Sequence, residues 1–182
     1  MGDNGHFYVP EELLAVYRDT IVPLADVLLP NQFEAEQLSG MKIANEEDGW
    51  KVCDWLHSRG RAETVVITSG EIGANADEIV SLASFGRGAN RVRVAIPRIA
   101  SSFTGSGDVF AASFLIWSRK LSDPVEIVQK TVNTTYAVLS RTYESFKHIE
   151  APTSYQKELK LIQSKKELEC PPDLIKATIV TR

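Results

Sequence analysis

The chain of 182 residues contains little cysteine and histidine. Its two cysteines, Cys53 and Cys170, have no neighbours at the spacing of a metal site or of a disulfide framework. This usage favours a reducing, cytoplasmic compartment. The three histidines, His6, His57 and His148, are equally isolated, so we expect each to be a surface or packing residue.

Neither a membrane nor a nucleic acid is an expected partner. No apolar run approaches the roughly 20 residues that a membrane-spanning helix needs, and residues 1–6 lack the basic and apolar regions of a secretion signal. The net charge is -4 and the basic residues are scattered, which disfavours nucleic-acid binding. The length and the 43% hydrophobic content are typical of one globular domain with a sizeable core.

Apolar runs that alternate with amphipathic stretches predict an α/β fold. The expected strands are residues 27–29, 64–68, 79–85, 92–96 and 177–180, with residues 86–88 as the turn of an antiparallel pair. The expected helices begin at Pro10, Asn31 and Asn45 or cover residues 109–118, 125–143 and 155–166. Because ligands of such folds bind at the carboxyl ends of strands, residues 31–34, 68–69 and 105–108 are candidate site segments.

Gly105, Ser106 and Gly107 form a small-residue turn that runs directly into an apolar helix. Free N–H groups and the helix dipole at such a helix start stabilise an anion, most naturally a phosphate. Asp108 follows at once, where a carboxylate could accept the proton of an attacking hydroxyl. A purely structural interpretation stays open, in which Ser106 or Asp108 only caps the helix.

The segment that begins at Asn31 also has two interpretations. Glu34 stands three residues after Asn31, which is the spacing of a capping box that needs no ligand. However, Leu29-Pro30-Asn31-Gln32-Phe33-Glu34 resembles the T-P-N-x-x-E segment of the ribokinase-like kinases. Residues 66–69 resemble the nucleotide-side strand end of that superfamily, and Gly105-Ser106-Gly107-Asp108 resembles its G-T-G-D motif.

Within this superfamily the chain most resembles the animal-type pyridoxal kinases. Met1-Gly2-Asp3 is similar to the end of their C-D-P-V-M-G-D motif, and residues 8–13 to their Y-V-P-E-x-L segment. Residues 161–166 and 177–180 resemble the tail of the family, so the resemblance covers essentially the whole chain. It implies ATP-dependent phosphorylation of the 5′-hydroxymethyl group of pyridoxal, pyridoxine or pyridoxamine.

The resemblance also assigns roles to single residues. Asp108 would be the catalytic base, and the backbone of Gly105, Ser106 and Gly107 would form the anion hole. Asp3 and Glu34 would face Mg²⁺, and a monovalent cation such as K⁺ is a further expected cofactor. The residues that would bind ATP are Asp3, Tyr8, Asn31, Glu34, Thr68 and Ser69. Ser106 replaces the usual Thr of G-T-G-D, and Leu29 replaces the Thr of T-P-N, which removes a hydroxyl beside Asn31.

The implied fold is a three-layer α/β/α ribokinase-like domain without its N-terminal strands and helices. Residues 1–182 would be the C-terminal, nucleotide-binding and catalytic portion of one domain, and the family forms homodimers. Most residues that grip the pyridoxal ring precede this portion, so we expect little activity from this chain alone. Two alternatives are a non-catalytic binding or regulatory subunit and another ribokinase-like kinase, such as a hydroxymethylpyrimidine kinase.

Overall fold

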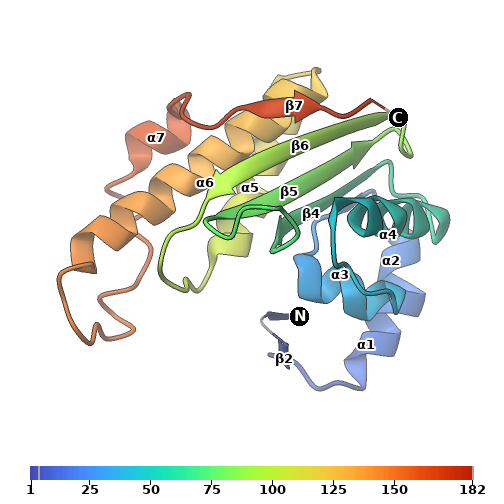
Figure 1. Cartoon of the computed structure of the whole chain (residues 1–182), viewed down its shortest axis with the longest axis horizontal. Helices are drawn as coiled ribbons and strands as arrows, with labels where there is room; N and C mark the ends of the chain where they lie inside the picture. The colour runs from blue at the N-terminus through green and yellow to red at the C-terminus, as the bar shows by residue number, and fades with distance from the viewer. Residues whose placement is uncertain (4, 182) are drawn as a thin grey trace. The chain divides into compact units, whose positions relative to one another are not determined.

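The computed structural model of the chain describes residues 1–3 and 5–181, with the backbone alone at Asp3 (Figure 1). The chain forms two compact units. The first comprises residues 1–96 together with the end of the chain from Thr178, and the second comprises residues 97–177. No helix within the described ranges is both long enough and apolar enough to cross a membrane.

The first unit is built on a five-stranded sheet (Figure 1). Its strands, in spatial order, are β3 (Val27–Leu28), β4 (Thr64–Gly70), β5 (Glu78–Phe85), β6 (Asn90–Pro97) and β7 (Ala177–Ile179). β3 and β4 are parallel, with Val27 opposite Thr64, whereas β4 and β5 are antiparallel. β5 and β6 are joined by a tight turn in which Gly86, Arg87 and Gly88 have positive φ. The expected strands and their turn are thus confirmed.

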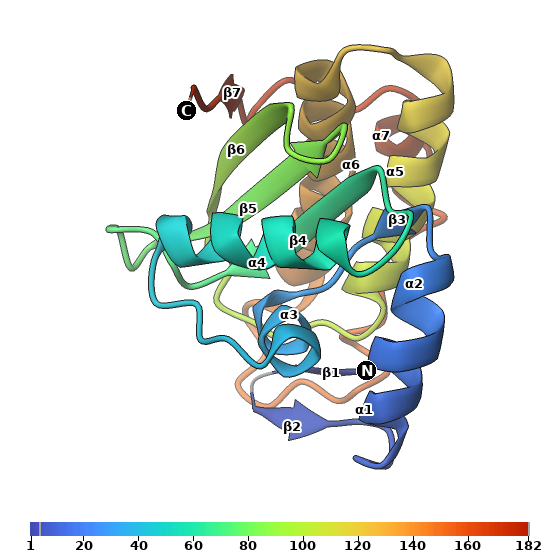
Figure 2. The same ribbon diagram turned by 90° about the vertical axis from the view of Figure 1, so that its right-hand side faces the viewer.

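Two helices cover one face of β4 in this unit, α3 (Gln32–Ser39) and α4 (Glu46–Ser58) (Figure 2). α4 begins at its N-cap Asn45 and buries Trp50, Val52, Cys53 and Leu56. Burial raises the pKa of the Cys53 thiol to about 12, so this cysteine is an inert core residue.

His57, near the end of α4, is a packing residue, as expected. Its Nδ1 lies 2.9 Å from the carbonyl oxygen of Ala62, and its Nε2 lies 2.9 Å from Oγ of Ser84. The ring is buried, and both nitrogens therefore have partners inside the protein.

The helix expected from Pro10 begins with a turn, and its first regular segment is α1 (Leu13–Val16). It continues as a π-helical segment, η1 (Tyr17–Ile21), and ends as α2 (Val22–Leu24). Pro23 explains the π segment, because its ring would clash with the carbonyl of Asp19 in a regular α-helix. Instead the amide of Val22 bonds the carbonyl of Tyr17 five residues back. Before this helix lies a short antiparallel pair, β1 (Gly2–Asp3) and β2 (His6–Phe7).

The second unit is dominated by a helical hairpin of α5 (Ser106–Lys120) and α6 (Pro124–Phe146). Asp123 caps α6 by accepting a hydrogen bond from the amide of Val125, at 3.1 Å. A side-chain hydrogen bond joins the last turn of α5 to the middle of α6, since Trp117 Nε1 donates to Oγ1 of Thr134 at 3.1 Å.

The helix predicted over residues 155–166 is wrong. Most of that segment forms turns, and a regular helix exists only as α7 (Lys165–Glu169). The amide of Lys160 bonds Oγ1 of Thr142 on α6 at 3.1 Å, instead of a carbonyl of its own segment. Tyr155 and Ile162 are 79% and 89% exposed, so the apolar residues do not form the buried stripe that would stabilise a helix.

Candidate active site

The start of α3 is closed by a complete capping box. Oδ1 of Asn31 accepts a hydrogen bond from the amide of Glu34 at 2.8 Å, and Oε2 of Glu34 accepts one from the amide of Asn31 at 3.0 Å. This reciprocal pair satisfies donors that a helix start would otherwise leave open. The predicted capping box is therefore confirmed.

The same two side chains also hold strand β1. Nδ2 of Asn31 donates to the carbonyl of Gly2 at 2.8 Å, while Oε1 of Glu34 accepts from the Met1 nitrogen at 2.7 Å and from the Gly2 amide at 3.3 Å. Both Glu34 oxygens thus already have donors. The predicted Asp3 follows directly, but its side chain lies outside the described residues. Tyr8 is 74% exposed, and its amide bonds the Met1 carbonyl at 3.0 Å.

Thr68 and Ser69 lie where β4 loses its regular pairing. Ile67 is opposite Leu82 and Gly70 is opposite Val80, so three steps along β4 match two along β5. The extra residue makes a bulge, a feature that re-aims side chains and often borders active sites. The amide of Thr68 bonds the carbonyl of Pro30 at 2.9 Å, which places the bulge beside the segment before α3. The carboxyl ends of parallel β3 and β4 therefore meet, as the sequence predicts.

The start of α5 differs from that of α3, because no side chain of the described residues caps it. The N-cap is Gly105, whose φ of 85° is left-handed and easily adopted only by glycine. The first backbone bond of the helix runs from the amide of Val109 to the Gly105 carbonyl at 3.1 Å. The Ser106 hydroxyl turns away and makes a long 3.4 Å contact with the carbonyl of Phe103. The N–H groups of this first turn consequently stay available for an anion.

Asp108 stands in the first turn of α5 and is exposed. One of its oxygens lies 4.0 Å from the point where a Gly105 Cβ would stand, so the carboxylate borders the glycine turn. Within the described part of the chain it has no hydrogen-bond or ion-pair partner. An added Cβ on Gly107 would meet no atom within 4 Å. The turn is therefore open at Gly107, whereas a Cβ on Gly105 would lie 3.5 Å from Cδ1 of Leu159.

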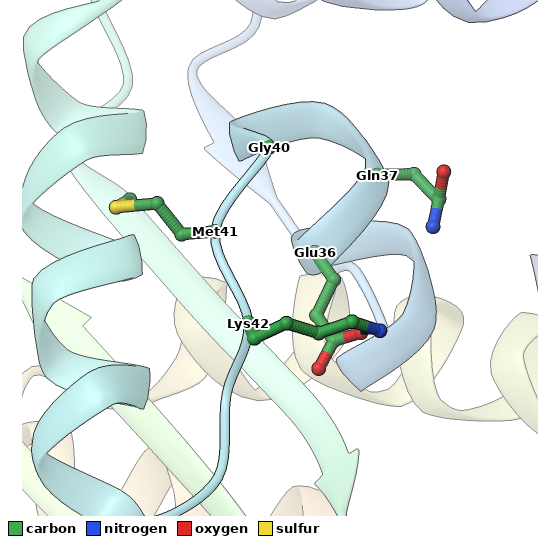
Figure 3. A pocket seen from close by; sticks show the side chains of 5 residues that line it. All are labelled: Glu36, Gln37, Gly40, Met41 and Lys42. Atoms are coloured by element: carbon green, nitrogen blue, oxygen red, sulfur yellow. Dashed lines mark hydrogen bonds and ion pairs between the residues drawn. The ribbon is translucent and has the colours of Figure 1, made fainter.

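A separate hollow of about 230 Å³ lies at the other end of α3 (Figure 3). Its lining consists of Glu36, Gln37, Gly40, Met41 and Lys42, none of which is a predicted site residue. Lys42 Nζ lies 2.7 Å from Oε2 of Glu36, and the amide of Ile43 donates to Oε1 at 3.0 Å. Burial by itself raises the pKa of Glu36, but Lys42 and the Ile43 amide outweigh burial and hold the pKa below its usual value.

The predicted site residues fall into the two units. Asn31, Glu34, Thr68 and Ser69 are brought together in the first unit, and residues 105–108 start α5 in the second. The described residues include no cluster of three or more histidine, cysteine or acidic side chains that could hold a metal ion. Gln32, which links α3 to the end of β4, was not predicted. The sequence indicated this residue only weakly, through a polar side chain at the first helical position after the N-cap Asn31.

Comparisons with known proteins give similarity to pyridoxal kinases over nearly the whole chain. The chain is 43% identical over 180 residues to the pyridoxal kinase of Arabidopsis thaliana, covering 97% of this chain and 58% of that protein. It is 40% identical over 191 residues to the pyridoxal kinase of Homo sapiens, covering 97% and 61%. The structure of the Leishmania donovani pyridoxal kinase in complex with ADP and pyridoxamine matches with a TM-score of 0.88 at 29% identity. That match covers 100% of this chain and 60% of the other.

This chain therefore spans about three fifths of the length of its relatives. The expected α/β, ribokinase-like fold is confirmed by the structural match. The sequence profile of the pfkB family carbohydrate kinases matches residues 7–149, well over half of the chain. The chain thus belongs to the pfkB family of carbohydrate kinases.

Proposed function

We propose that this chain is the nucleotide-side, phosphoryl-transferring portion of a pyridoxal kinase. The reaction would move the γ-phosphoryl group of ATP to the 5′-hydroxymethyl group of pyridoxal, pyridoxine or pyridoxamine. The observation that carries the proposal is the uncapped start of α5 with the unpartnered carboxylate of Asp108 beside it. The similarity to pyridoxal kinases supports the choice of substrate.

In this proposal Asp108 is the catalytic base. Its carboxylate accepts the proton of the 5′-hydroxyl as that oxygen attacks the γ-phosphorus of ATP. The bond between the γ-phosphorus and the bridging oxygen breaks, and ADP leaves with the bonding electrons. Because Asp108 has no partner among the described side chains, it need not break an ion pair in order to act.

The glycine turn would stabilise the charge of the transferred group. The N–H groups of Ser106, Gly107 and Asp108 point to the open helix start, where the helix dipole adds positive potential. Such fixed donors cost no reorganisation when charge develops on the phosphoryl oxygens, and this makes them effective in phosphoryl transfer. The absence of a side chain at Gly107 leaves room for that approach.

The first unit would bind the rest of the nucleotide. We propose that Thr68 and Ser69 face the phosphates and ribose, that Asn31 lies beside them, and that Tyr8 contacts ATP. Mg²⁺ would enter with the ATP phosphates and be faced by Asp3 and Glu34. Since both Glu34 oxygens already accept N–H donors, a water-mediated contact fits Glu34 better than direct ligation. We further propose that K⁺ is a cofactor and that the protein forms a homodimer, because the resemblance implies both. The cysteine usage is the basis for proposing a cytoplasmic location.

The activity of the 182-residue chain alone is a separate question. Because the chain spans about three fifths of its relatives' length, we propose that residues 1–182 alone, without the portion of the relatives that they do not cover, convert pyridoxal slowly or not at all. In that case it would act with a chain that supplies the portion, or serve as a binding subunit. Conversion of pyridoxal by the purified chain at a rate typical of kinases would contradict this part.

A chimera tests the reaction itself. The portion of the human enzyme that this chain does not cover is fused to residues 1–182, and circular dichroism verifies folding. The chimera is assayed with ATP and with pyridoxal, pyridoxine, pyridoxamine, a hydroxymethylpyrimidine and ribose. We expect phosphorylation of the three vitamers, with little turnover of the other two. A folded chimera that prefers ribose or the pyrimidine would overturn the assignment.

A further inference from the structure

Gln32 is the first residue of α3, and both ends of its side-chain amide are used. Its Oε1 accepts a hydrogen bond from the amide of Glu71 at 2.8 Å, across 39 residues of sequence. Its Nε2 donates to the carbonyl of Ile43 at 2.8 Å. One side chain thus joins the start of α3 to the residue after β4 and to the loop before α4.

The bond to Glu71 is accompanied by a second bond between this region and the end of β4. This second bond runs from the amide of Thr68 to the carbonyl of Pro30 at 2.9 Å. Thr68 and Ser69 occupy the bulge between these two bonds, where the regular pairing with β5 is interrupted. A bulged segment has lost part of its strand pairing, so its position depends more on such outside bonds.

The packing around Gln32 supports a fixed geometry. A Cβ on Gly70 would lie 3.3 Å from Oε1 of Gln32, so a glycine there permits the close approach. The Ile43 partner is itself held, because its amide donates to Oε1 of Glu36 at 3.0 Å. The carboxamide of Gln32 is therefore anchored at one end and can orient the chain at its other end.

We propose that Gln32 is a positioning residue, which fixes the bulge at Thr68–Ser69 in the conformation that receives the nucleotide. This role rests on the proposed function, in which those two residues face ATP. Gln32 would not touch the nucleotide itself. It acts through the amide of Glu71 and so through the backbone on either side of the bulge.

The test is hydrogen exchange of the 182-residue chain, resolved to residues 68–71, with and without millimolar Mg²⁺ and ATP. Gln32→Met keeps the length of the side chain but removes both hydrogen bonds. Gln32→Glu keeps an acceptor for the Glu71 amide but loses the donor to Ile43 and Glu36, so it separates the two ends of the side chain. Gln37→Met, on the same helix in the lining of the hollow, is the matched control.

Without ATP, we expect Gln32→Met to accelerate exchange of the Glu71 amide about fivefold or more, the effect of one lost hydrogen bond. We also expect it to remove the protection that ATP gives to residues 68–71. Gln32→Glu should restore slow Glu71 exchange only in part, because its second oxygen would face the Ile43 carbonyl and the Glu36 carboxylate, and Gln37→Met should change neither readout. Unchanged Glu71 exchange in Gln32→Met, or ATP protection equal to that of the unmodified chain, would overturn the role of Gln32. Failure of ATP to protect residues 68–71 in the unmodified chain would instead overturn the nucleotide contact, and the role with it.

Discussion

The starts of α3 and α5 solve the same physical problem in opposite ways. Each helix start presents N–H groups without partners inside the helix. At α3, Asn31 and Glu34 satisfy these groups and also hold Gly2. At α5, a left-handed glycine turns the chain, and no described side chain caps the helix. The capped start of α3 stabilises the fold, whereas the uncapped start of α5 leaves its N–H groups open to a ligand.

The largest expected effect is at the open start. In the chimera, Asp108→Asn should lower kcat about 10²- to 10⁴-fold, because the amide cannot accept the proton of the hydroxyl. The melting temperature should hardly change, since Asp108 has no described partner to lose. Steady-state assays and thermal unfolding measure the two quantities. Asp123→Asn, at the capped start of α6, is the matched control and should retain activity. An Asp108→Asn enzyme with most of its kcat would exclude this carboxylate as the base.

The capped start of α3 should contribute mainly to the free energy of unfolding. Asn31→Ala removes the cap of α3 and the bond to Gly2, and we expect a loss of about 1–2 kcal/mol in the free energy of unfolding. Ser106→Ala, at the open start, should cost less than about 0.5 kcal/mol, since its hydroxyl caps nothing. Urea titrations followed by circular dichroism provide both values. Equal losses for the two variants would contradict the contrast between the helix starts.

The two glycines of the open start should respond to alanine with opposite signs. Gly105→Ala forces a side chain into left-handed backbone and should cost about 1 kcal/mol. Gly107 lies within the helix with open space around it, so Gly107→Ala should stabilise by about 0.5–1 kcal/mol. Thermal unfolding of both variants measures these shifts. A stabilising Gly105→Ala would show that the turn does not need its left-handed conformation.

We expect a smaller, pH-dependent change in the free energy of unfolding at Glu36, near the C-terminal end of α3. The pKa of Glu36 is lowered in the folded protein, so its contribution is fully present above the ordinary value of 4.5 and disappears as the pH falls through the folded pKa. Glu36→Gln should therefore cost about 0.5–1 kcal/mol at pH 7 and less in more acidic solution. Urea titrations from pH 7 to pH 3 measure this trend. Glu47→Gln, an exposed partner of Lys51, should show a smaller change at every pH. A Glu36→Gln deficit that grows toward low pH would contradict the direction of the pKa shift.

The fold was predictable where local signals and tertiary packing agree. The capping pair of Asn31 and Glu34 and the strand expected at residues 64–68 lie where the sequence predicts them. Residues 155–164 were mispredicted because helical spacing of apolar residues does not reveal that the Lys160 amide bonds Thr142 of α6. The π-helical turn before Pro23 was also missed, although the ring of that proline provides its physical cause.

The sequence predicted which segments form the candidate site, but not the hydrogen bonds that connect them. Glycine spacing and an adjacent carboxylate indicated residues 105–108, and strand ends indicated Thr68 and Ser69. The structure adds the bulge at Thr68 and the bridging role of Gln32. The bulge depends on how β4 pairs with β5, and the Gln32 bond reaches Glu71 across 39 residues, so no local pattern of the sequence encodes either.

The bond between Trp117 and Thr134 has a consequence for the energetics of ligand capture. It joins α5 to α6 near the C-terminal end of α5, far along the helix from its uncapped first turn. The open end can therefore be ordered by packing elsewhere, without a local cap that would compete with the ligand. In the proposed function, an incoming anion would meet donors that are already ordered, so less of its binding free energy would be spent on ordering them.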